Sequence, residues 1–592
     1  MSIVEKRNQE MQQMHHPCTA ERRPMLELRD VSFRYKGRHS DTLRHVGLSL
    51  ESGEMLLLAG RSGCGKSTLI KVISGLVSGE GQERREGTVL WNGEDMADWP
   101  PEKIGLLAGT VYQTPDDQLF AMTVEDEAGF ALENQGEAPE AVHDQVEEIL
   151  GLTGLAGLEK RGIHQLSGGQ RQRMALASVL IGKPRLLILD EPVSQMDPRG
   201  VQDFMELLLR LNREEGIAIL MIEHRVNELA CYFHRLAIMR EGRIVYDGPL
   251  QAAWAFLTGR ENLGLREPQC VKLGRVLGLP ELSSDVAQTV LQIKTYCRPV
   301  PAVEAERSGG AGKHQSSSRP GGKTGETGRN GRPLVEAEKV CFRYPGTTED
   351  VLKEVSFSLN AGEIIALMGC NGAGKSTLLN LLGGLTGPSA GRLLFEGGPL
   401  ARQRGSTGYL LQEPDLMLLA GTVWEELKWK NDTLTDAEAE ALLQRLHLEP
   451  CRDDFPLALS KGQRLRTVLG SFFAWRPKLL LLDEPTTGQD EASLQEIAAL
   501  LSHYRDHGGT VLLCTHDVEL ASCLADHVLL LNQGRVLAYG TVFDVLSRRD
   551  LLAAGGLVAP PVLAVSGALG IPPCITVEEV CHCVGPATLG RN

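Results

Sequence analysis

The sequence predicts an α/β fold made of two successive copies of one unit. Two glycine-rich loops, Gly60–Thr68 and Gly369–Thr377, both fit the pattern G-x-x-x-x-G-K-[ST]. Each loop follows a short apolar run and opens an apolar, helix-like segment, which is the strand–loop–helix order of a phosphate-binding loop. Continuous apolar runs such as Leu186–Leu189 and Leu479–Leu482 suit buried parallel strands, which alternate with longer helix-like stretches.

The spacing of matching residues shows that the duplication extends along most of the chain. The offset between the copies falls from 309 at the loops to 293 at Asp190 and Asp483, so the first copy holds 16 more residues between these points. A glycine- and serine-rich stretch with few apolar residues separates the copies and is typical of a flexible linker. We predict a disordered lead at 1–24, a first domain at 25–285, a linker at 286–333 with its glycine- and serine-rich core at 308–332, a second domain at 334–575 and a tail at 576–592.

Composition narrows the classes of protein that the chain can belong to. Its formal net charge of −15 argues against nucleic-acid binding, which usually needs a basic patch. No uninterrupted apolar run reaches the roughly 18 residues of a membrane-spanning helix, and the nearest candidate, Gly555–Pro573, contains four prolines. The 13 cysteines are scattered, which fits a reducing cytosol. The terminal group of Cys574, Cys581, His582 and Cys583 matches no zinc spacing.

The two glycine-rich loops predict the binding of nucleotide phosphates with Mg²⁺. In such a loop the backbone N–H groups surround the phosphates, the lysine reaches the β and γ phosphates, and the following serine ligates Mg²⁺. The expected phosphate-binding residues are Gly60, Ser62, Gly63, Cys64, Gly65, Lys66, Ser67 and Thr68 in the first loop, and Gly369, Asn371, Gly372, Ala373, Gly374, Lys375, Ser376 and Thr377 in the second, with Ser67 and Ser376 as metal ligands.

An acidic pair follows an apolar run in each copy. Asp190-Glu191 and Asp483-Glu484 come directly after these runs. Carboxylates at the ends of parallel strands lie beside the phosphate loop, because open α/β sheets bind ligands at that edge. We expect each aspartate to hold Mg²⁺ and each glutamate to orient or deprotonate the attacking water.

The segment between each loop and acidic pair resembles the signature motif of ABC ATPases. Leu166–Gln170 reads L-S-G-G-Q, and Leu459–Gln463 reads L-S-K-G-Q, with one departure at Lys461. In that family the signature helix of one domain caps the γ-phosphate bound on the other, because a helix N-terminus favours an anion. The resemblance implies binding roles for Ser167, Gly168, Gly169, Gln170, Ser460, Gly462 and Gln463, adenine stacking by Tyr35 and Tyr344, Q-loop roles at the metal and in catalysis for Gln113 and Gln412, D-loop roles for Asp197 and Asp490, and switch-histidine roles in catalysis for His224 and His516.

The same resemblance covers about 26–280 and 335–573 and implies the architecture and the activity. The expected fold is two P-loop NTPase domains of the ABC type in tandem, each with a helical signature subdomain and a short C-terminal tail. The implied activity is ATP hydrolysis coupled to transport, with two Mg·ATP held between domains that pair within the chain.

A narrower resemblance concerns the segments around the Q-loop glutamines. Tyr112–Phe120 is similar to the Q-N-P-D-D-Q pattern of energy-coupling-factor importer ATPases, which take up cobalt and vitamins, and Leu411–Asp415 is a looser version. The resemblance implies an integral membrane coupling protein and a separate membrane protein that captures the substrate as partners. It places the chain peripherally on the cytoplasmic face of the cell membrane, with no nucleic acid as a partner.

Two alternatives stay open. A fused ATPase of another ABC importer class, such as a sugar importer, commonly has a degenerate second phosphate loop, whereas Gly369–Thr377 is intact. Soluble double-ABC proteins that act on ribosomes or DNA usually carry a long charged helical linker or zinc-binding cysteine pairs, and this chain has neither pattern in its sequence.

Overall fold

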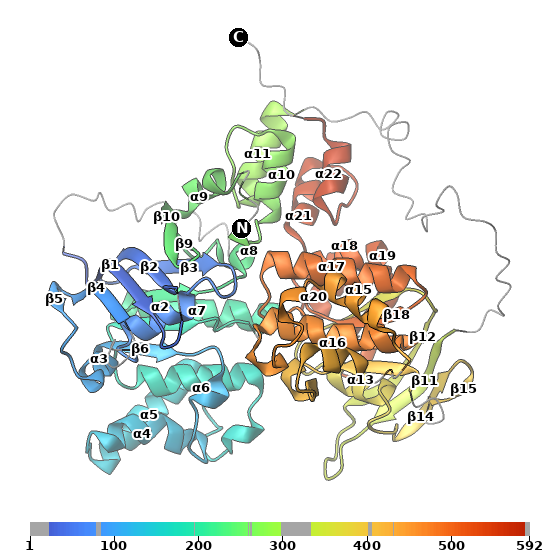
Figure 1. Ribbon diagram of the computed structural model, residues 1–592, viewed down its shortest axis with the longest axis horizontal. Helices are drawn as coiled ribbons and strands as arrows, with labels where there is room; N and C mark the ends of the chain where they lie inside the picture. Colours follow the sequence, from blue (N-terminus) through green and yellow to red (C-terminus); the bar gives the residue numbers. More distant parts are fainter. Residues whose placement is uncertain are drawn as a thin grey trace.

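The computed structural model shows two similar α/β units side by side, with a group of helices from both units beside them (Figure 1). The predicted glycine- and serine-rich linker core at 308–332 and almost all of the predicted lead lie outside the described residues. The structure describes residues 23–38, 40–77, 84–194, 196–258, 260, 263–297, 333–400, 405–429, 431 and 433–586.

The first unit contains two sheets. A four-stranded antiparallel sheet has the order β2-β1-β4-β5, and a six-stranded sheet has the order β10-β9-β3-β8-β7-β6, parallel except for the β9–β10 pair. The strands are β1 (Leu26–Arg34), β2 (Leu43–Leu50), β3 (Met55–Gly60), β4 (Arg84–Trp91), β5 (Glu94–Asp95), β6 (Ala108–Val111), β7 (Leu186–Asp190), β8 (Ala218–Ile222), β9 (Arg235–Arg240) and β10 (Arg243–Pro249).

The second unit repeats these sheets strand for strand. Its antiparallel sheet has the order β12-β11-β14-β15, and its larger sheet has the order β16-β17-β18-β13-β19-β20. The predicted α/β duplication is therefore confirmed. The strands are β11 (Val335–Phe342), β12 (Leu352–Leu359), β13 (Ile364–Met368), β14 (Ala390–Phe395), β15 (Gly398–Pro399), β16 (Thr407–Leu410), β17 (Leu479–Asp483), β18 (Thr510–Cys514), β19 (His527–Asn532) and β20 (Arg535–Thr541).

The central strands form as their apolar runs predict. All five residues of β7 and all five of β17 are buried, because both faces of these sheets are covered. Helices cover one face, and a helix together with the antiparallel sheet covers the other. In the first unit α2 (Lys66–Ile73) and α7 (Pro198–Glu215) follow the phosphate loop and β7, and in the second unit α13 (Lys375–Leu382) and α17 (Glu491–Asp506) take the same places. The remaining elements of the ATPase cores are α3 (Pro101–Leu107), α8 (Val226–Leu229), α9 (Leu250–Leu257), α18 (Val518–Leu524), α19 (Val542–Leu546) and α20 (Arg549–Ala554).

Each unit carries a helical subdomain between its Q-loop glutamine and its acidic pair. The subdomain of the first unit packs its apolar helix faces into the main core of that unit. Its helices are α4 (Val124–Asn134), α5 (Pro139–Thr153) and α6 (Gly168–Leu180); those of the second unit are α14 (Val423–Lys428), α15 (Asp436–Leu446) and α16 (Lys461–Trp475), and short 3₁₀ turns lie at η1 (Pro115–Asp117), η2 (Ile163–Gln165), η5 (Pro414–Met417), η6 (Glu449–Cys451) and η7 (Pro456–Ala458).

Four helices from the ends of the two units share one apolar core. They are α10 (Gln269–Leu277), α11 (Val286–Tyr296), α21 (Pro561–Leu569) and α22 (Val577–Cys583), drawn in green and red beside one another (Figure 1). The domain division differs here, because α11 lies in the range predicted as linker and α22 in the range predicted as tail. Helix α11 packs mainly on α21 and helix α22 mainly on α10, a pairing between the copies that the local sequence does not reveal. Among the described residues no helix has both the length and the apolar character needed to cross a membrane.

Candidate functional site

Both predicted phosphate loops lie at the carboxyl end of a central strand. A Cβ on Gly60 would lie 2.2 Å from the carbonyl oxygen of Met239, and its φ is 153°, so the turn requires glycine there. Lys66 lies over its own loop, where Nζ donates to the carbonyl oxygens of Gly60 and Arg61 at 2.7 and 2.9 Å. In the second loop Nζ of Lys375 repeats this arrangement with two carbonyl oxygens at 2.8 and 3.0 Å.

Two of the three predicted metal ligands, the serine and the aspartate, meet at each loop. Asp190, the last residue of β7, accepts a hydrogen bond from the side chain of Ser67, and Asp483 is paired in the same way with Ser376. Burial, together with the charge of neighbouring Glu191, raises the pKa of Asp190 to about 6, and burial also raises the pKa of Asp483. A carboxylate and a hydroxyl oxygen on a strand end beside a phosphate loop are ligands that suit Mg²⁺, whose charge would compensate the buried aspartate.

The predicted catalytic residues of the first unit contact one another at Glu191. Nε2 of His224 lies 2.9 Å from one carboxylate oxygen, and Nε2 of Gln113 donates to the other. Burial alone would raise the pKa of Glu191, but the hydrogen bond and charge of His224, with the charges of Lys66 and Lys461, lower it below its usual value. The carboxylate is therefore held ionised, as a group that accepts a proton must be.

The second unit assembles the same residues less completely. Nδ1 of His516 lies 3.6 Å from Oε1 of Glu484, and the hydroxyl of Thr487 donates to Oε2 at 3.4 Å. Gln412 is exposed, and in the described structure no hydrogen bond joins it to Glu484. The Q-loop glutamine thus reaches the acidic pair in the first unit alone.

A tyrosine stands beside each phosphate loop. The hydroxyl of Tyr35 lies 3.2 Å from that of Thr68, and the hydroxyl of Tyr344 lies 3.1 Å from that of Thr377. Each ring also packs edge-on against a phenylalanine two residues earlier in its strand segment, at 4.9 and 5.0 Å between centroids. These contacts fix both rings next to the last residue of the loop, where the resemblance expects adenine to stack.

The two units face each other through the aspartates of their predicted D-loops. Oδ2 of Asp490 accepts from the backbone N–H of Ser62 at 3.2 Å, and Oδ2 of Asp197 accepts from that of Asn371 at 2.9 Å. In both cases the other carboxylate oxygen caps the aspartate's own helix, α17 or α7, at 2.9 or 2.8 Å. Each aspartate therefore connects the start of a helix in one unit to the phosphate loop of the other.

The signature motifs begin the helices that face across this interface. Ser167 and Ser460 form capping boxes with the glutamines three residues later, at the starts of α6 and α16. Lys461 is the first residue of α16, and a Cβ built on Gly488 would lie 3.0 Å from its Nζ and 3.5 Å from Oε2 of Glu191. The altered signature of the second unit thus lies by the acidic pair of the first, as the sequence predicts.

Two charged residues near the sites escaped the sequence reasoning. Glu223 is buried beside His224 and accepts from the N–H groups of Val193 and His224 at 3.2 and 3.1 Å; burial raises its pKa to about 8. Glu223 could have been found in the sequence as an acidic residue directly after the apolar run Ile217–Ile222. Arg266 crosses to the other unit, and nothing in its own neighbourhood of the sequence indicates that contact.

Comparison with known proteins places this arrangement in a family. Residues 43–194 and 352–487 match the ABC transporter family. A Methanosarcina mazei protein named as an ABC transporter ATP-binding protein is 35% identical over 559 residues, which cover 92% of this chain and 94% of that one. The chain therefore belongs to the ABC transporter ATP-binding proteins. It is an ATP-binding, ATP-hydrolysing subunit with two ATPase domains fused in one chain.

Two further matches carry more specific names. A Bacillus subtilis protein named for HMP/thiamine import, YkoD, is 32% identical over 549 residues, which cover 91% of this chain and 95% of that one. The solved structure of cbiO1 from Clostridium perfringens, described as part of the ABC transporter complex cbiONQ, is 28% identical; it covers 44% of this chain and 100% of its own, with a TM-score of 0.38.

Proposed function

We propose that the chain powers an importer of the energy-coupling-factor type, which takes up a vitamin or a transition metal. The observation that carries this proposal is the segment after Gln113, where the Q-N-P-D-D-Q-like pattern builds a braced loop. Gln118 accepts from the backbone N–H of Tyr112 at 3.2 Å and donates to the carbonyl oxygen of Thr110 at 3.1 Å. The second glutamine of the pattern therefore anchors the loop to β6.

The braced loop presents apolar side chains outward. Phe120 and Met122 are 65% and 79% exposed, although both are large and apolar. Directly behind them the buried carboxylate of Glu127 accepts from the N–H groups of Phe120 and Ala121 at 2.9 and 2.8 Å. Exposed apolar side chains on an anchored backbone favour docking of a partner.

The second unit presents a matching loop. Glu426 is buried in the place of Glu127 and accepts from the N–H groups of Leu419 and Ala420 at 2.9 and 2.8 Å. Leu416 and Leu419 are exposed there. Two such surfaces, one on each domain, fit an integral membrane coupling protein with two docking segments. A separate membrane protein would capture the substrate, and the chain would lie peripherally on the cytoplasmic face of the membrane without a nucleic-acid partner.

The reaction at each site is phosphoryl transfer to water. Lys66 or Lys375 and the loop N–H groups bind and orient the phosphates, and Ser67 with Asp190, or Ser376 with Asp483, would hold Mg²⁺, which supplies positive charge to the transferred group. In the first unit the ionised Glu191 orients the water and accepts its proton, while His224 fixes the carboxylate. Because each phosphate loop contacts the aspartate of the other unit, binding of ATP would close the pair and hydrolysis would loosen it.

Purification of the chain from a detergent extract of the native membrane tests the importer proposal. We expect one polytopic coupling protein and one small membrane protein to co-purify with it. Replacement of Phe120, Met122 and Leu419 by serine should abolish this recovery and leave ATPase activity of the isolated chain intact, since none of the three lies at a phosphate loop. Recovery of a periplasmic-type binding protein would indicate another importer class, and recovery of ribosomal subunits or DNA-repair factors would refute the proposal.

A further inference from the structure

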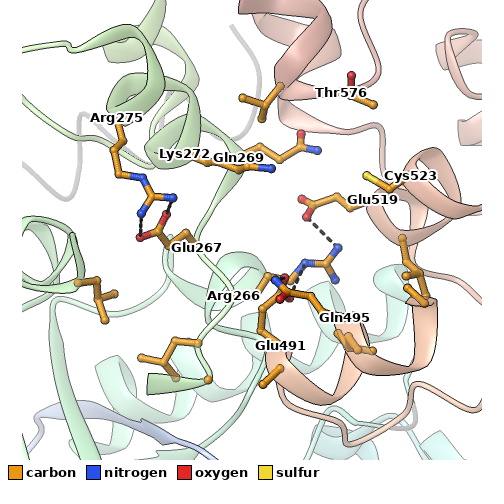
Figure 2. A pocket seen from close by; sticks show the side chains of 18 of the residues that line it. Arg266, Glu267, Gln269, Lys272, Arg275, Glu491, Gln495, Glu519, Cys523 and Thr576 are labelled. Carbon is orange, nitrogen blue, oxygen red and sulfur yellow. Dashed lines mark hydrogen bonds and ion pairs between the residues drawn. The ribbon is translucent and has the colours of Figure 1, made fainter. Parts of the chain in front are cut away.

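Arg266 of the first unit binds three carboxylates of the second. It lies in the segment between α9 and α10 (Figure 2). Its guanidinium donates to both carboxylate oxygens of Asp517, one of them at 3.2 Å, lies 3.0 Å from Oε2 of Glu519, and lies 3.7 Å from Oε2 of Glu491. One planar group with five donors thus serves three acidic side chains.

The contact is largely removed from solvent. The side chains of Arg266, Asp517 and Glu519 are 18%, 20% and 20% exposed. Burial raises the pKa of Glu519 to about 7 despite the attraction of Arg266, whereas the pKa of Asp517 is lowered because that attraction outweighs its burial. Without the guanidinium, three carboxylates would face one another at low dielectric, which is strongly unfavourable.

Other cations around the same cavity already have partners. The cavity has a volume of about 510 Å³ and lies between the two units. Lys272 pairs with Glu578 at 3.0 Å and Arg275 with Glu267 at 3.0 Å (Figure 2 shows the second pair). Among the described residues that line this cavity, Arg266 is therefore the cation that pairs with Asp517, Glu519 and Glu491 of the second unit.

The acidic group lies next to the catalytic loops of the second unit. Asp517 directly follows His516 and caps α18 by accepting from the N–H of Leu520 at 2.9 Å. Glu491 directly follows Asp490, the aspartate that contacts the first phosphate loop. Arg266 thus ties together the loop that carries His516 and the loop that carries Asp490.

The equivalent connection in the other direction is missing from the described part of the chain. The position 292 residues after Arg266, the offset that relates His224 to His516, is Val558, which is 63% exposed. In the second unit Asp517 follows His516, whereas in the first unit the residue after His224 is Arg225. Arg225 pairs with Glu228 of its own unit. The two sites therefore differ in how their histidine loops are held.

We propose that Arg266 is a positioning residue that acts from the first unit to hold the His516 loop in the geometry needed for hydrolysis at the Lys375 site. The inference deepens the proposed function, because it rests on the catalytic role assigned to His516 and Glu484. Under this proposal, turnover at the Lys375 site depends on docking of the segment that leads into α10. It therefore also depends on the packing of the helices that the two chain ends share. The His224 loop has an ion pair within the first unit, between Arg225 and Glu228, and should depend less on Arg266.

Single-turnover hydrolysis in two backgrounds tests the proposal on the full chain. Glu191→Gln leaves the second-unit site active, and Glu484→Gln leaves the first-unit site active. Arg266→Gln should lower kcat at the second-unit site by about 10-fold or more, the scale expected when a catalytic group is misplaced, with little change in KM for ATP. At the first-unit site the loss should be smaller, because Arg266 approaches that site through Glu491, 3.7 Å away and next to the Asp490 that contacts the first phosphate loop.

The controls separate positioning from general damage. Arg266→Lys keeps the charge but loses the planar fork, so it should restore part of the rate at the second-unit site. Val558→Gln, the matched change at the equivalent position, should affect neither site. Equal losses at both sites, or full activity of Arg266→Gln at the second-unit site, would overturn the proposed role. Full activity of His516→Ala in the Glu191→Gln background would instead show that the assignment of the site itself is wrong.

Discussion

Removal of the charge on Lys461 should accelerate hydrolysis at the first-unit site. A Cβ on Gly488 would lie 3.0 Å from Nζ of Lys461 and 3.5 Å from Oε2 of Glu191. The two charged atoms are therefore at most about 7 Å apart. The ammonium lowers the pKa of Glu191, together with His224 and Lys66. A carboxylate with a lower pKa is a weaker proton acceptor, so Lys461 works against the general base that it faces.

The size of the effect follows from the distance and the exposure. At about 6 Å, two unit charges interact by about 3 kcal/mol at an effective dielectric of about 20 and by about 0.7 kcal/mol in water. Lys461 is exposed, so the lower end applies, and we take about 1 kcal/mol. Loss of the ammonium should therefore raise the pKa of Glu191, and a base of higher pKa should raise the rate by about 2- to 5-fold.

Two substitutions distinguish the charge from the bulk of the side chain. In the Glu484→Gln background, Lys461→Gln keeps the length and removes the charge, whereas Lys461→Gly also restores the room that Gly168 leaves in the other signature. Both should speed single-turnover hydrolysis at the first-unit site, the glycine variant more. Gly168→Lys in the Glu191→Gln background is the matched control and should slow the second-unit site. A slower rate in Lys461→Gln would show that the ammonium stabilises the phosphate in the transition state and would refute this reasoning.

The other predictions concern the acid pairs, pH and domain contact. Glu191→Gln with Glu484→Gln should abolish hydrolysis and retain ATP through gel filtration, whereas Lys66→Ala with Lys375→Ala should lose ATP binding itself. Glu223 has a pKa of about 8 in the folded chain, so it keeps its proton to higher pH there than in the unfolded chain. Its contribution to stability is complete below pH 4.5 and is lost as pH rises through 8. Glu223→Gln should flatten this decline of the free energy of unfolding with pH, measured by urea unfolding. Asp490→Ser keeps a helix cap but is too short for Ser62, so labels placed on the two units should move apart without ATP.

The sites were predictable where a short pattern determines local geometry. The loop Gly60–Thr68 specifies its own turn, and the apolar run that ends at Asp190 specifies the strand that brings this carboxylate to Ser67. The motif order, repeated in both copies, and the family resemblance assigned His224 and Gln113 to the catalytic site, and the structure shows that both contact Glu191.

What could not be predicted depends on pairing between the copies. Helix α11 packs against helices of the other chain end, so its sequence alone resembles a continuation of the linker. Gln412 aligns with Gln113 yet is exposed and separate from Glu484, because the sequence pattern fixes the position of the loop but not its closure on the acidic pair. Arg266 has its partners some 250 residues away, beyond the reach of any local motif.

The differences between the copies gather at the surface where the two units meet. In a symmetric homodimer each interface residue occurs twice, so a substitution alters both sites together. In a fused chain each interface residue occurs once, so a substitution in one copy leaves the equivalent residue of the other copy unchanged. Lys461 stands across from Glu191 while Gly168 serves the other site, and Arg266 holds one histidine loop while Val558 is exposed at the equivalent place. Both departures alter a site from the neighbouring unit and leave the phosphate loops intact. We infer that fusion allows the two sites to take unequal shares of turnover while both retain their ATP-binding residues.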